Sequence, residues 1–113
     1  MPAYVQGNAP AVYPGDTVIL SNAALAGLKT KAVVMATTAG SEVIDITINN
    51  ESAQVMTLQY AHADAEANYQ AFYVGATAAT IAANKAATFQ VGAGFYRLLA
   101  AADPGATLIT LSR

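Results

Sequence analysis

The feature that most constrains the fold is a series of short strand-like segments, separated by turn signals about every ten residues. The clearest segment runs from Glu42 to Asn49, where Ile44, Ile46 and Ile48 alternate with polar residues. A period of two indicates a strand with one buried face and one face in solvent. The series predicts an all-β fold, an antiparallel β-sandwich or barrel of seven to eight short strands.

The other predicted strands are bounded by residues that favour turns. They cover residues 17–20, 31–36, 54–62, 69–74, 88–91, 95–100 and 107–112. Residues 42–49 and 54–62 are predicted to form a hairpin across the polar turn 49–52. Residues 22–28 could form one helical turn and 38–41 a turn. Residues 75–87 are predicted to be a weak strand followed by a turn at 83–85.

The chain has 113 residues, which is enough for one domain. Its first sixteen residues carry Pro2, Pro10 and Pro14, a density that disfavours helix and interior strand. We therefore predict an extended N-terminal arm over residues 1–12 and a turn over residues 13–16. Residues 17–113 are then the single sandwich domain.

Composition argues against several classes of function. The sequence has no cysteine, which excludes disulfides, thiolate metal sites and cysteine nucleophiles. Its five cationic residues are scattered, so we expect no nucleic-acid binding. It has no apolar run of about 20 residues, and we expect neither a membrane span nor a secretory signal.

Few residues suggest catalysis. His62 is the only histidine, and His62, Asp64 and Glu66 could share one strand face as a metal or acid–base site. A strand end that leads into a solvated loop explains the same residues more simply. Gly92 and Gly94 lack the third glycine of a phosphate-binding loop, and the seven acidic residues are dispersed. We expect no enzyme activity, no cofactor and no bound metal.

The surface and the tyrosines point instead to contacts with other chains. Only 11% of residues are charged, against about 25% in typical domains. Tyrosine combines a large apolar ring with a hydroxyl, which suits interfaces and sugar stacking. Tyr60 and Tyr96 are expected to pack within the sandwich. The residues expected to contact another chain are Tyr4, Val5, Val12, Tyr13, Tyr69 and Tyr73.

Four stretches carry a resemblance to a known group of proteins. They are the strand–turn–strand run 44–58 (IDITINNESAQVMTL), the run 80–91 (TIAANKAATFQV), the run 94–97 (GFYR) and the ending 107–113 (TLITLSR). Together they resemble the small β-sandwich virion proteins of tailed bacteriophages, which include capsid decoration (cement) proteins and some tail components. The resemblance covers about two-thirds of the chain and carries over no functional residue.

The resemblance implies a structural protein that binds the outside of a capsid and reinforces it. Its partner would be the major capsid protein or another virion protein, and the protein itself would be a homo-oligomer. It would be located on the capsid surface after assembly in the host cytoplasm. A carbohydrate-binding module, with Tyr69 and Tyr73 as a stacking platform on one strand face, is the alternative.

Overall fold

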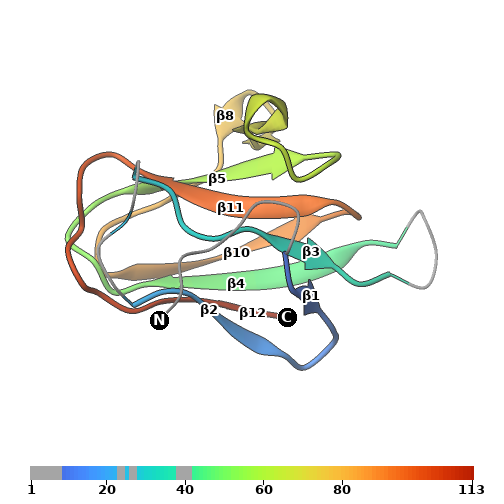
Figure 1. Ribbon diagram of the computed structural model, residues 1–113, viewed down its shortest axis with the longest axis horizontal. Helices are drawn as coiled ribbons and strands as arrows, with labels where there is room; N and C mark the ends of the chain where they lie inside the picture. The colour runs from blue at the N-terminus through green and yellow to red at the C-terminus, as the bar shows by residue number, and fades with distance from the viewer. Residues whose placement is uncertain (1–8, 23–24, 26–27, 38–41) are drawn as a thin grey trace.

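The chain forms two packed β-sheets (Figure 1). The computed structural model describes residues 9–22, 25, 28–37 and 42–113. In spatial order, the first sheet contains β1 (Ala11–Val12), β3 (Val33–Met35), β11 (Phe95–Ala100), β5 (Met56–Ala61) and β6 (Gln70–Ala71), and β9 (Thr80–Ile81) also pairs with β5. The second sheet contains β10 (Lys85–Val91), β4 (Ile44–Asn50), β12 (Ile109–Ser112) and β2 (Thr17–Ser21). The predicted all-β sandwich of short strands is confirmed.

Two small elements outside both sheets lie on the side of β5. They are the hairpin of β7 (Tyr73–Val74) and β8 (Thr77–Ala78), and the 3-10 helix η2 (Glu66–Asn68). Residues 69–74, predicted as one strand, are thus divided between β6 and β7. The weak strand predicted over 75–87 is β8 and β9, and β10 begins at Lys85, three residues before the predicted start.

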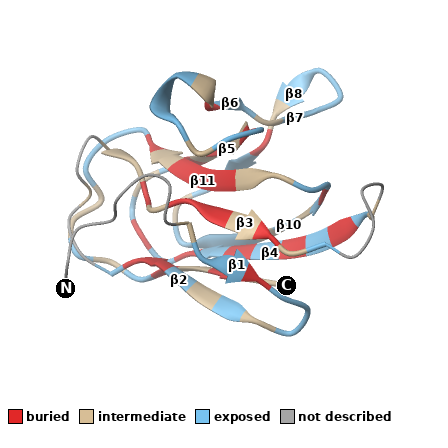
Figure 2. Ribbon diagram, turned by 45° about the vertical axis from the view of Figure 1, so that its right-hand side comes forward, coloured by how far each residue is buried: buried red, intermediate tan, exposed pale blue. Residues whose placement is uncertain are grey.

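The core lies between the two sheets, and period-two alternation produces it. In β4, buried and exposed residues alternate along the whole strand, and Ile44, Ile46 and Ile48 face inward as predicted. Met56 and Leu58 of β5 meet them from the opposite sheet in the same apolar cluster. Figure 2 shows such buried positions along β3, β4 and β11. Each fully buried Ile or Leu contributes about 1.5–3 kcal/mol relative to an exposed one.

Apart from the short strands β6 to β9, the strands alternate between the two sheets along the chain. β1, β3, β5 and β11 belong to the first sheet, whereas β2, β4, β10 and β12 belong to the second. The predicted hairpin of residues 42–49 and 54–62 is therefore wrong. β4 pairs with β10 and β12, and β5 pairs with β11, β6 and β9, so residues 51–55 cross between the sheets.

A buried asparagine explains why the chain crosses at this point. Asn50 ends β4 with its side chain fully buried, and its Oδ1 accepts hydrogen bonds from the backbone N and the Oγ of Ser52, at 3.0 and 2.6 Å. Its Nδ2 donates to the carbonyl oxygens of Gln54, Ile81 and Ala82, at 2.8, 3.3 and 3.2 Å. The last two acceptors belong to the crossing from β9 to β10. The crossing from β4 to β5 and the crossing from β9 to β10 lie side by side, because β4 pairs with β10 in one sheet and β5 pairs with β9 in the other. The Asn50 amide therefore joins the two crossings.

The end of the predicted arm belongs to the sandwich. β1 pairs in parallel with β3, and the Val12 side chain is completely buried in the core. The guanidinium of Arg113 donates to the carbonyls of Val12 and Ala36, at 2.8 and 2.5 Å, and pairs with Glu42 at 2.7 Å. Val12 is therefore not available to contact another chain, contrary to the expectation from its place among prolines. The predicted turn follows, where the backbone N of Asp16 donates to the carbonyl of Tyr13.

Some sequence predictions fall on residues outside those described. They include Tyr4 and Val5 of the arm, most of the helical turn at 22–28 and the turn at 38–41.

Asn50→Ala is expected to lower the free energy of unfolding by about 2–4 kcal/mol, because it removes the shared partner of several buried polar groups and leaves a cavity. Asn49→Ala is the matched control, since the Asn49 side chain is exposed and bonds only to the exposed Glu51 among the described residues. It should change stability by no more than about 0.5 kcal/mol. Urea denaturation checks both, and equal losses would contradict the role given to Asn50.

Gly94→Ala is expected to destabilise the fold by at least about 1 kcal/mol. Gly94 has a φ of 141°, and a Cβ there would overlap the ring of Tyr60. Gly92→Ala is the control, because a Cβ at Gly92 would meet no atom within 4 Å. Thermal unfolding of the two variants should separate them, and a tolerated alanine at 94 would show that the Tyr60 ring moves easily.

Candidate functional site

A groove runs along the outer side of β10, between that strand and the β7–β8 hairpin. It has a volume of about 660 Å³ and is lined by residues 72–74, 77–80 and 88–90. This volume falls within the ~300–1,000 Å³ typical of ligand-binding clefts. None of the lining residues is charged. The groove is thus suited to a neutral partner.

One wall of the groove is rigid because the base of the β7–β8 hairpin, here called the neck (Phe72 and Ala79), is hydrogen-bonded to β5. The backbone N of Phe72 donates to the carbonyl of Leu58, and the N of Leu58 donates to the carbonyl of Ala79, at 2.8 and 2.9 Å. The Phe72 ring also packs edge-on against Tyr96, with ring centroids 6.0 Å apart. Tyr96 is buried in the core, which raises the pKa of its hydroxyl to about 12. The hairpin is therefore anchored in the core.

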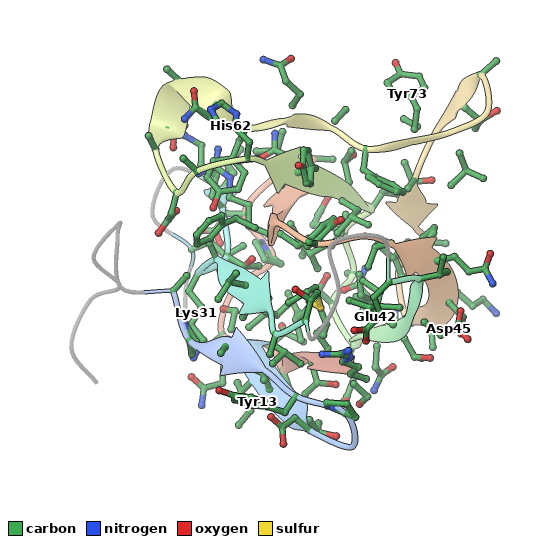
Figure 3. All side chains as sticks on the ribbon, turned by 90° about the vertical axis from the view of Figure 1, so that its right-hand side faces the viewer. Tyr13, Lys31, Glu42, Asp45, His62 and Tyr73 are labelled. Carbon is green, nitrogen blue, oxygen red and sulfur yellow. The ribbon has the colours of Figure 1, made fainter. Side chains whose placement is uncertain are left out.

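Beyond this neck, the hairpin presents apolar side chains to solvent. Tyr73 is 58% exposed and Val74 is 57% exposed. In Figure 3, Tyr73 lies at one end of the molecule and Tyr13, which is 59% exposed, lies at the opposite end. Both tyrosines are therefore accessible, as an interface role requires, but they belong to different surfaces.

Tyr69 does not join Tyr73 in a stacking platform. Its side chain is buried, its hydroxyl donates to Asp64 Oδ1 at 2.7 Å, and the Arg97 guanidinium lies 3.8 Å from its ring centre. Both the ring face and the hydroxyl are therefore used within the chain. The expectation that Tyr69 is exposed for sugar or protein contact is therefore wrong. The loop 62–69 folds back over the outer face of the first sheet, and the Tyr69 side chain is buried there.

The same loop brings a carboxylate onto Arg97. Arg97 donates from Nε to Gln59 Oε1 at 2.7 Å and from its two terminal nitrogens to Glu66, at 2.7 and 3.2 Å. Lys29 also pairs with Glu66. Hydrogen bonding to Arg97 first, and to Lys29 second, lowers the pKa of Glu66 from 4.5 to about 2. This cluster holds the loop in place, and each polar group in it has a structural role.

The possible site of His62, Asp64 and Glu66 is not assembled. His62 is exposed after β5, whereas Asp64 is bound by Tyr69 and Glu66 by Arg97 and Lys29 (Figure 3). Among the described residues, no three His, Cys, Asp or Glu side chains gather as metal ligands. Residues 50–52 (Asn-Glu-Ser) match a glycosylation sequon, but the Asn50 side chain is fully buried.

Sequence reasoning missed most of the groove. It singled out Tyr73 but not Val74, Phe89 or the neck residue Phe72. Strand-like composition around residues 69–74 was visible, but it does not show which side chains remain outside. Arg97 was also missed, because an arginine on the outer face of a strand is normally exposed.

Comparison with protein-family models, with curated proteins and with solved structures gives no match for this chain. Within the described part of the chain, no helix combines the length and the apolar character needed to cross a membrane.

The Glu66 interactions predict a defined pH dependence. Because the pKa of Glu66 is lower in the folded protein, its contribution to stability is present above about pH 4.5 and is lost as the pH falls toward 2. Wild type should therefore be more stable than Glu66→Gln at pH 7, and the difference should shrink across that window. Glu51→Gln, which changes an exposed carboxylate, is the control. Urea denaturation between pH 2 and pH 7 measures the difference, and a gap that does not vary with pH would contradict the assignment.

Proposed function

We propose that this protein is a non-enzymatic structural subunit of a virion, a decoration (cement) protein that binds the assembled capsid shell. The observation that carries the proposal is the pair of open sandwich edges. β10 and β2 are the outermost strands of the second sheet, and large apolar side chains are exposed at both edges: Ile19 on β2, and Tyr73 and Val74 beside β10. Unpaired strand edges with apolar neighbours favour association with other chains.

The distribution of charge supports the same conclusion. Three of the five cationic side chains, Lys29, Arg97 and Arg113, form ion pairs with Glu66 or Glu42 inside the chain. The sequence has few charged residues, and several of these form ion pairs that hold its own loops in place. A surface with so little free charge loses little solvation when another protein covers it.

The assignment to a virion rests on the sequence resemblance to small phage sandwich proteins. The structure supports a more general part of the proposal, an assembly role, through its edges and its groove. The carbohydrate-binding alternative is weakened, because its platform needed both tyrosines and only Tyr73 is exposed. The partner is the major capsid protein or another virion protein, together with further copies of this chain.

Sedimentation tests the proposal directly. A lysate of the native source is run through a density gradient, and an antibody locates the protein. We expect it to travel with large particles, at a copy number comparable to that of the major shell protein if it decorates the head. A copy number far below that value would place it in the tail and contradict decoration. If the protein stays at the top of the gradient as a small species, the virion role is wrong.

A further inference from the structure

We infer that residues 1–8 of one copy bind as an added strand along the free edge of β10 in a second copy, with apolar side chains in the groove beside it. This inference deepens the proposed assembly role and rests on it. The copies would then associate head to tail.

The edge of β10 selects an extended peptide as the occupant. β10 is seven residues long and pairs only with β4 in the described structure, over its whole length from Lys85 to Val91. Successive residues of an edge strand point their backbone groups alternately toward and away from the neighbouring strand. The outward groups can be paired by a strand from another chain, which is how sheet edges bind extended peptides.

The N-terminal segment matches this groove in chemistry. Residues 1–8 (MPAYVQGN) contain no Asp, Glu, Lys, Arg or His, and the residues that line the groove are also uncharged. Tyr4 and Val5 are types that favour strands, and since consecutive strand residues point to opposite faces, one of the two would enter the groove walled by Val74 and Phe89. Pro2 and Gly7 flank this strand-forming part, where Pro is tolerated because an edge strand needs only half of its N–H groups paired.

The topology places donor and acceptor on opposite sides of one copy. The segment joins the sandwich at β1, on one edge of the first sheet, whereas the β7–β8 hairpin lies beyond β5 at the other edge (Figure 1). Residues of that hairpin line the groove. Four strand spacings separate β1 from β9, about 19 Å in total. Eight extended residues span at most about 26–29 Å. Crossing its own sheet would therefore use most of the segment, and Tyr4 and Val5 would lie over that sheet before the groove is reached.

The segment consequently reaches the groove of a neighbour more readily than its own. A donor on one edge and an acceptor on the other make a heterologous interface, which repeats from copy to copy. This differs from a two-fold dimer, in which the same surface would be used by both partners. The difference gives the inference a distinctive test.

The test uses two variants that each lack one half of the interface. Deletion of residues 1–8 removes the donor and keeps the groove, whereas Val74→Glu places a carboxylate in the groove and keeps the donor. Analytical ultracentrifugation of the full-length chain should show self-association. Each variant alone should associate at least ~10-fold more weakly. The deletion lacks the strand that binds, and Val74→Glu would have to bury an unpaired carboxylate. Thermal melts confirm that both variants remain folded.

Mixing the variants is the decisive step. An equimolar mixture of the deletion variant and Val74→Glu should form a dimer, because one brings a free groove and the other a free segment. Val55→Glu is the matched control: it adds the same charge at an exposed apolar position in the crossing 51–55, on neither open sheet edge. It should associate like the wild type. Because the chain lacks cysteine, Val5→Cys in one copy and Thr88→Cys in another should also join through a short bifunctional maleimide.

Three results would overturn the inference: a full-length chain that stays monomeric, a mixture that stays monomeric, or loss of association in Val55→Glu but not in Val74→Glu. None of these outcomes decides the proposed function, because binding to a shell is measured separately by sedimentation with particles. A protein that travels with particles but does not self-associate would keep its structural role and lose the head-to-tail contact.

Discussion

The buried amide of Asn50 is the interaction on which the arrangement of the sheets depends. It closes the crossing from β4 to β5 through Ser52 and Gln54 and holds the crossing from β9 to β10 through two carbonyls. A buried polar group without partners is costly, so this network is stable only when both crossings are in place. The two sheets are thereby kept in register at one end of the sandwich, and β10 is placed beside β4.

This arrangement makes most strand pairing non-local. β4 lies between β10 and β12, and β11 lies between β3 and β5, so neighbours in the sheet are distant in sequence. In the described structure, no further strand covers β10 and β2, the two edge strands of the second sheet. The first sheet ends on the groove side in strands of two residues, β6 and β9, whereas the seven-residue β10 ends the second sheet. The groove is a consequence of that mismatch in length.

Charged side chains stabilise loops in this protein more than they decorate its surface. Arg113 ties the C-terminus to the carbonyls of Val12 and Ala36, and Arg97 holds the loop 62–69 over Tyr69. Both arginines are nearly buried, so the loss of a carboxylate partner would leave a cation with little access to water. Among the described residues, the exposed surface is rich in alanine and threonine, carries few charges and includes several large apolar residues. That surface and the open edges support the proposed role in assembly.

Period-two alternation determined the fold class, most strand positions and the inward faces of β4 and β5, because burial of one strand face is a local property of the sequence. It could not decide which strands pair. A hairpin and a crossing both bury Ile44, Ile46 and Ile48 together with Met56 and Leu58; they differ only in whether the two strands share a sheet or face each other. The exposure of Tyr73 followed from neither pattern nor composition, and Tyr69 and Val12 are buried by segments distant in sequence. The strand order, the groove and the buried arginines were decided by the tertiary structure alone, since each depends on contacts between segments that no local pattern relates.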